Sequence, residues 1–120
     1  KYFLKNKKRG RIINISSMAA ALNENGTSIY AASKIFIEKF LSIFSKELSK
    51  TKITCNTIGI TYFNSQTFKQ LNNLILSKSY EKTNISRTLK PQEVLHVINF
   101  FLDEKSDIVT GQKLYLGMSL

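Results

Sequence analysis

The stretch "NISSMAAALNENGTSIYAASK", residues 14–34, decides how this sequence is interpreted. It starts inside the apolar, β-branched run "RIINIS", residues 11–16, which is typical of a buried parallel strand. A polar loop with an Asn-Gly pair follows, and a long helix is predicted over residues 28–49. Tyr30 and Lys34 lie four positions apart at the start of that helix. The Tyr-x-x-x-Lys spacing is weak by itself, because chance supplies such pairs in a chain rich in lysine.

The rest of the chain alternates strands with helices. Cations followed by Gly10 indicate the end of a helix, and Pro91 favours the start of another. The expected elements are a helix end over residues 2–10, strands over 11–16, 52–58 and 112–117, helices over 28–49 and 90–104, and a polar loop with a short helix over 61–89. This alternation favours an α/β fold with a parallel sheet, in one domain over residues 1–120.

The long helix carries Tyr30 and Lys34 on an apolar face. Positions that share this face are Tyr30, Lys34, Ile37, Leu41, Phe44 and Leu48. An ammonium on a core face is costly unless a polar group meets it there, which favours a functional site at Lys34 over a solvated pair. A second, largely apolar row consists of Ser33, Phe36, Phe40 and Ile43. The helix is therefore expected to be covered on more than one side, by its own domain or by a second subunit.

Ser17 is the third candidate residue of this site. It follows the strand over residues 11–16, and open parallel sheets bind ligands outside the carboxyl ends of their strands. The long helix starts near the same edge, so the hydroxyl of Ser17, the phenol of Tyr30 and the ammonium of Lys34 are expected to converge there. Ser16 is the neighbouring alternative, but successive residues of a strand point to opposite faces.

These residues together resemble the C-terminal half of the short-chain dehydrogenase/reductases, and are similar to the 3-oxoacyl-carrier-protein reductase branch. "GRIINISS" looks like the family's strand leading to the catalytic serine, and "YAASK" looks like its Tyr-x-x-x-Lys signature. Ser17 lies thirteen residues before Tyr30, the spacing typical of the family, and is preferred to Ser16 for that reason. "KELSKTKITCNTI" and the ending "KPQEVLHVINFFLDEKSDIVTGQKLYLGMSL" extend the likeness over nearly the whole chain. The resemblance implies the C-terminal half of a Rossmann-like doubly wound parallel sheet, without the N-terminal dinucleotide-binding half.

The resemblance also implies an oxidoreductase that interconverts a carbonyl and an alcohol with NAD or NADP. Tyr30 would be the general acid and base, passing a proton to the carbonyl oxygen as hydride arrives from the nicotinamide. A free phenol is almost fully protonated at neutral pH, and the ammonium of Lys34 and the cationic oxidised nicotinamide would favour the phenolate. Lys34 would hold the nicotinamide ribose hydroxyls, and Ser17 would donate a hydrogen bond to the developing alkoxide.

Two departures from the family pattern concern the cofactor. Ile60 and Thr61 stand where the family usually has a Pro-Gly pair after the second strand. By resemblance, Phe63 and Ser65 would touch the nicotinamide carboxamide. The family's Gly-rich phosphate loop, its ribose selector and its catalytic Asn would lie upstream of residue 1, so the choice between NADH and NADPH stays open. The chain is accordingly expected to be a truncated or split reductase that is inactive alone.

Composition and charge set weaker limits. The net charge is +10 and basic residues crowd positions 1–11, but a solvated helix end is preferred there to a nucleic-acid arm. No run approaches the roughly 20 apolar residues of a membrane span. Cys55 is the only cysteine and is expected to be a core thiol in a cytoplasmic protein. His96 has no second metal-type ligand nearby, so no metal site is predicted.

Two functions of different classes follow from these observations. The first is the oxidoreductase, acting on a small carbonyl or alcohol substrate, as a homo-oligomer or together with a missing N-terminal half. The second is a catalytically inactive remnant that serves as an interaction module through its apolar long helix. Binding of a nicotinamide cofactor would favour the oxidoreductase over the inactive remnant. A basic nucleic-acid binder built on residues 1–11 is the least favoured interpretation, and steep salt dependence of binding would be its sign.

Overall fold

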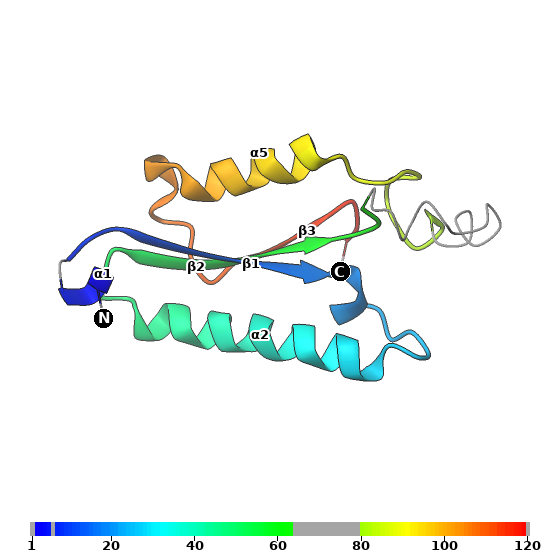
Figure 1. Ribbon diagram of the computed structural model, residues 1–120, viewed down its shortest axis with the longest axis horizontal. Helices are drawn as coiled ribbons and strands as arrows, with labels where there is room; N and C mark the ends of the chain where they lie inside the picture. The colour runs from blue at the N-terminus through cyan, green and yellow to red at the C-terminus, as the bar shows by residue number, and fades with distance from the viewer. Residues whose placement is uncertain (1, 6, 64–79, 120) are drawn as a thin grey trace.

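The computed structural model describes residues 2–5, 7–63 and 80–119. Its strands β1 (Gly10–Ser17), β2 (Ile53–Ile60) and β3 (Lys113–Leu116) form one parallel sheet in the order β1-β2-β3. The helices α2 (Ser28–Glu47) and α5 (Pro91–Leu102) cover opposite faces of this sheet (Figure 1). Among the described residues, the remaining elements are the short helix α1 (Tyr2–Lys5) and the 3-10 turns η1 (Met18–Ala20) and η2 (Glu104–Ser106). The predicted alternation of strands and helices is confirmed.

The two strand connections have opposite hands. α2 links β1 to β2 and α5 links β2 to β3, so both connections advance in the same direction across the sheet. Because the two helices lie on opposite faces (Figure 1), one connection must be left-handed, although such crossovers are nearly always right-handed. The arrangement gives β2 a helix on each side, and its residues from Thr54 to Gly59 are buried.

In the part of the chain that the structure describes, both helices contribute buried apolar side chains to the core. Leu41 of α2 and Leu48, the C-cap residue of that helix, pack on Cys55 of β2, with Phe44 and Ile53 at the margin of this cluster. Phe101 of α5 is 2 % exposed. Burial raises the pKa of the Cys55 thiol, so this side chain behaves as a small apolar group.

The buried face of α2 differs from the predicted one by a small rotation. Leu41 and Leu48 are buried as expected, but the other buried positions of the helix are Glu38 and Ser45. Tyr30 and Ile37, which the spacing places on the core face, are 51 % and 39 % exposed. A prediction based on apolar spacing places Ile37 rather than Glu38 on the buried face of the helix. The strands beneath this half of α2 instead present the hydroxyl groups of Ser16 and Tyr115, which bind Glu38.

The start of the chain also differs from expectation. The first helix ends at Lys5, Lys7 takes a left-handed conformation with φ of 50°, and Gly10 begins β1 instead of stopping a helix. Arg9 and Arg11 then form ion pairs with Asp107, and Arg9 also pairs with Glu104. These two cations of the basic segment therefore attach β1 to the region of η2.

Candidate active site

The two serines at the carboxyl end of β1 have different surroundings. Ser16 is 2 % exposed, and its hydroxyl donates to Glu38 Oε1 at 2.5 Å. Ser17 is the last residue of β1 and the N-cap of η1, where its Oγ accepts a hydrogen bond from the backbone N–H of Ala19 at 3.3 Å. The hydroxyl of Ser16 is thus engaged beneath α2, and Ser17 lies at the edge where parallel sheets bind ligands.

Lys34 joins α2 to this same edge. Its Nζ donates to the carbonyl oxygen of Ile15 at 3.3 Å, two residues before Ser17. The same Nζ lies 5.6 Å from the centroid of the Tyr30 ring, within the range of a cation–π contact. The ammonium of Lys34, a partly exposed residue, therefore has a backbone carbonyl of β1 as its acceptor.

Tyr30 leaves its phenol accessible, since the residue is 51 % exposed in the first turn of α2. The structure thus brings Tyr30 and Lys34 together on α2 and places the Lys34 ammonium against β1, the strand that ends in Ser17. The interactions of the described residues include none between Ser17 and either of the other two. The catalytic roles of Ser17, Tyr30 and Lys34 stay predictions.

The neighbouring strand supplies the wall beside Ser17. In the register of the sheet Ser17 is the partner of Ile60, the last residue of β2, and Thr61 follows with 6 % exposure. Phe63 is half-buried and forms a parallel bridge with Leu89, whose N–H donates to the carbonyl of Tyr62 at 2.7 Å. Ser65, the other predicted carboxamide contact, lies outside the described residues. The roles of Phe63 and Ser65 in cofactor binding stay predictions.

Glu38 is the residue of this region that the sequence interpretation missed. Its carboxylate accepts hydrogen bonds from Ser16 and Tyr115 on Oε1, at 2.5 and 2.6 Å, and contacts Lys113 Nζ through Oε2 at 3.3 Å. Burial, together with the hydrogen bond to Glu38, raises the pKa of the Tyr115 phenol. The available signal was an acidic residue four positions after Lys34 and three before Leu41, close to the apolar face of the predicted helix.

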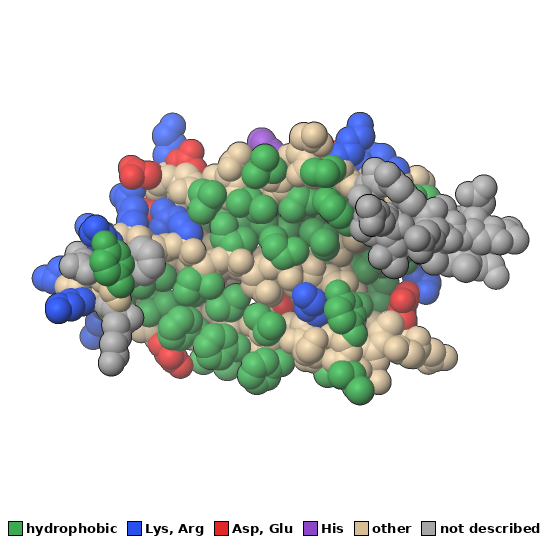
Figure 2. Space-filling view, viewed as in Figure 1, with side chains coloured by type: hydrophobic (Ala, Val, Ile, Leu, Met, Phe, Trp, Pro, Cys, Tyr) green, Lys and Arg blue, Asp and Glu red, His purple; other side chains and the backbone are tan. Residues whose placement is uncertain are grey.

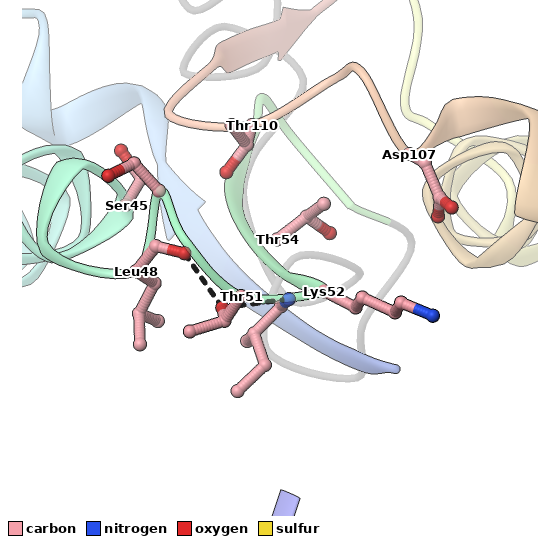
Figure 3. Close-up of a pocket in the computed structure, with 9 residues that line it drawn as sticks. Ser45, Leu48, Thr51, Lys52, Thr54, Asp107 and Thr110 are labelled. Carbon is pink, nitrogen blue, oxygen red and sulfur yellow. Dashed lines mark hydrogen bonds between the residues drawn. The ribbon is translucent and has the colours of Figure 1, made fainter. Parts of the chain in front are cut away.

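A separate hollow lies at the other end of the sheet (Figure 3). Its volume is about 190 Å³, and it borders Ile53, the first residue of β2. The side chain of Thr51 belongs to its wall and is already engaged, because its Oγ1 donates to the Leu48 carbonyl at 2.7 Å and accepts from the Ile53 N–H at 3.1 Å. Parallel sheets bind ligands at the opposite, carboxyl end of their strands, so this hollow is not the candidate site.

The residues at the carboxyl end of β1 fit one part of a nicotinamide cofactor. The ammonium of Lys34 and the accessible phenol of Tyr30 suit ribose hydroxyls and a reacting carbonyl. Within the described ranges there is no Gly-rich strand-turn-helix to hold the cofactor phosphates. The same ranges contain no group of three or more residues suited to a metal ion, and no helix with the length and apolar character of a membrane span.

Residues 2–118 match the model of a protein family described as enoyl-(acyl carrier protein) reductase. The chain therefore belongs to this family of short-chain dehydrogenase/reductases. The 3-oxoacyl-[acyl-carrier-protein] reductase of Aggregatibacter actinomycetemcomitans is 29 % identical over 117 residues, which are 98 % of this chain and 48 % of the relative. The chain spans about half the length of the curated relatives it matches.

Solved structures share the fold. Actinorhodin polyketide ketoreductase, crystallised with NADPH, superposes with a TM-score of 0.83 at 21 % identity, over 96 % of this chain and 48 % of its own. 4-Hydroxyisoleucine dehydrogenase, in complex with NADH, gives a TM-score of 0.85 at 19 % identity, over 98 % of this chain and 49 % of its own. The predicted family and Rossmann-like fold are confirmed, and an NAD(P) cofactor is typical of the neighbours, without a choice between the two.

Proposed function

We propose that this chain is the catalytic part of an oxidoreductase that interconverts a carbonyl and an alcohol through Ser17, Tyr30 and Lys34. The observation that carries the proposal is the position of Lys34 Nζ, 3.3 Å from the Ile15 carbonyl at the end of β1 and 5.6 Å from the ring of Tyr30. An ammonium held between a strand end and an accessible phenol provides the electrostatic setting for proton transfer by that phenol.

Each of the three side chains has a distinct task in this proposal. Tyr30 donates its phenolic proton to the carbonyl oxygen, and the positive charge of Lys34 stabilises the phenolate that remains. Ser17 Oγ accepts from the Ala19 N–H with one lone pair, so its own O–H is free to donate to the oxygen on which negative charge develops. The bound nicotinamide would supply or accept the hydride, and Tyr30 and Lys34 would contact its ribose.

We propose that residues outside this chain bind the cofactor phosphates. The relatives are about twice as long, and we propose that the full enzyme contains an N-terminal dinucleotide-binding half, without which residues 1–120 are inactive. The substrate is a small carbonyl or alcohol compound, and NAD or NADP is the cofactor. The compartment that we propose is the cytoplasm, where Cys55 stays a buried free thiol.

A second candidate function rests on the outer surface of α2. Its apolar row includes Phe36, Phe40 and Ile43, which are 70 %, 51 % and 49 % exposed. Figure 2 shows hydrophobic side chains gathered over both helices on one face of the molecule. Such a surface is suited to pairing with a second copy of the chain, whether the site is active or not. An inactive interaction module would keep this pairing and lose nicotinamide binding.

The decisive experiment measures NAD(P)H-dependent reduction of acetoacetyl-coenzyme A by the complete natural protein. Tyr30→Phe is expected to lower kcat by about 10²-fold or more, the range typical of a lost general acid. Tyr2→Phe, in α1 and away from the carboxyl end of β1, is the matched control and should keep wild-type turnover. Full turnover in Tyr30→Phe would contradict the catalytic role, and a wild-type protein that neither binds NAD(P)H nor turns over would favour the interaction module.

A further inference from the structure

Glu38 is the most deeply buried residue of α2, at 3 % exposure. An ionised carboxylate can only accept hydrogen bonds, so the hydroxyls of Ser16 and Tyr115 both donate to its Oε1. The raised pKa of Tyr115 keeps that phenol protonated and able to donate at neutral pH. Lys113 Nζ contacts the other carboxylate oxygen at 3.3 Å. Donors from β1 and β3 thus engage both oxygens of the buried carboxylate.

Stability alone is a poor reason for a charge at this position. Glu38 lies on the same side of α2 as Leu41, whose apolar cluster with Cys55 continues beneath the helix. A leucine at position 38, with apolar partners in place of the Ser16 and Tyr115 hydroxyls, would extend that cluster without desolvating a carboxylate, and replacing a whole buried ionic group in this way is often neutral or stabilising. What a leucine would not provide is direction: hydrogen bonds define the rotation and the axial position of a helix, whereas apolar contacts tolerate sliding.

The bonds of Glu38 lie next to the candidate site. Lys34 precedes Glu38 by one helical turn and bonds the carbonyl of Ile15, while Glu38 bonds Ser16, the next residue of β1. Two successive turns of α2 therefore hold two successive residues of the strand, and Ser17 is the residue that follows them.

The third strand is connected through a row of residues across the sheet. Ser16, Gly59 and Tyr115 are register partners on β1, β2 and β3. Because Gly59 has no side chain, the ring of Tyr115 occupies the space above it, and its hydroxyl reaches the same oxygen of Glu38 as Ser16 does. The position of α2 is thus defined relative to both outer strands of the sheet.

We propose that Glu38 is a positioning residue of the candidate site. Its hydrogen bonds to β1 and β3 fix α2 so that Tyr30 and Lys34 stay in place at the edge that bears Ser17. Glu38 touches neither substrate nor cofactor. This inference rests on the proposed function, and it adds a residue that acts through Lys34 rather than on the reacting atoms.

The test compares Glu38→Leu, Glu38→Gln and the control Glu47→Gln, an exposed glutamate near the other end of α2, in the complete natural protein. Glu38→Leu is expected to lower kcat for acetoacetyl-coenzyme A reduction about tenfold or more, with KM within about threefold, because misplaced catalytic groups lose transition-state stabilisation. Its thermal midpoint should be lower than that of the wild type, because the buried hydroxyls of Ser16 and Tyr115 lose their acceptor. Glu38→Gln should recover most of kcat, since the amide oxygen still accepts from Ser16 and Tyr115.

Hydrogen exchange provides a second readout that does not depend on turnover. Amides of residues 30–34 should exchange faster in Glu38→Leu than in the wild type, and should be unchanged in Glu47→Gln. If Glu38→Leu does not fold, Tyr115→Phe removes one donor, keeps the ring, and should show the same pattern in weaker form.

The outcomes separate the two proposals. A wild-type protein that does not reduce the probe would contradict the proposed function, and the exchange of residues 30–34 would still decide the role of Glu38. Wild-type kcat in a folded Glu38→Leu protein, or exchange identical to the wild type in the variants of Glu38 and Tyr115, would overturn the positioning role.

Discussion

The ring of Tyr115 packs so closely against Gly59 that a side chain at position 59 would overlap it. The two are register partners on β3 and β2, and a Cβ atom built on Gly59 would lie 2.3 Å from Cδ1 of Tyr115. Such a distance is far below a van der Waals contact. Gly59 therefore serves close approach inside a strand rather than a turn, and this approach lets Tyr115 reach Glu38 at 2.6 Å.

Gly59→Ala is expected to lower the free energy of unfolding by about 1–3 kcal/mol, the usual range for overpacking a core. The added methyl group would displace the ring of Tyr115 and weaken its bond to Glu38. Urea denaturation of the wild type, Gly59→Ala, Tyr115→Leu and the double variant measures the effect as a cycle. With Tyr115→Leu present, Gly59→Ala should cost less, and an equal cost in both backgrounds would contradict this explanation.

The neighbouring serines of β1 should respond to substitution in opposite ways. Ser16→Ala removes a donor from the buried carboxylate of Glu38 and should lower the free energy of unfolding by about 1–3 kcal/mol. Ser17→Ala should instead lower kcat by about 10²-fold, as expected for loss of one oxyanion donor, with a stability loss of at most about 1 kcal/mol from the N-cap of η1. Parallel denaturation and turnover measurements check both. A larger kcat loss in Ser16→Ala than in Ser17→Ala would reverse the assignment.

Local sequence signals predict most of the fold. The β-branched run at the start of β1, Pro91 at the start of α5 and the long periodic segment of α2 each depend on nearby residues, and the structure confirms all three. The likeness of motif spacing indicates the family on the same basis. Local signals do not determine which of two neighbouring faces of α2 is buried against the sheet. Ser16 and Tyr115, which are remote from Glu38 along the chain, determine that choice by the hydroxyls they present to the helix.

The first turn of α5 should show a pH-dependent contribution to stability. Arg87 forms two hydrogen bonds to the Glu93 carboxylate, at 2.9 and 2.6 Å, and the Lys90 N–H adds a third at 2.8 Å. The bond to Arg87, followed by that to Lys90, lowers the pKa of Glu93 from 4.5 to about 2. Because the folded state holds the charged form more strongly, this contribution is present above about pH 4.5 and is lost as the pH falls toward 2.

Thermal midpoints of the wild type and Glu93→Gln, measured from pH 7 down to about pH 2, check this contribution. The wild type should be the more stable protein at neutral pH, and the difference should shrink below about pH 4.5. Glu47→Gln is the matched control and should follow the wild type. A difference that stays constant over the whole range would show that ionisation of Glu93 is not its cause.

The apolar row on the outside of α2 should mediate self-association. Phe36 is 70 % exposed and Ile43 is 49 % exposed, in a helix whose other side already packs on the sheet. Replacing both by serine removes apolar surface without opening the core, so the folded state should persist while self-association weakens. Sedimentation velocity over a range of protein concentrations measures this change.

The matched control is the double variant Leu95→Ser with Leu102→Ser, on the exposed side of α5, where the two leucines are 53 % and 51 % exposed. If both double variants weaken association equally, nonspecific hydrophobic association rather than the row on α2 is the cause. If only the α2 variant weakens it, the row is a specific interface, because nonspecific apolar contacts would not distinguish the two helices.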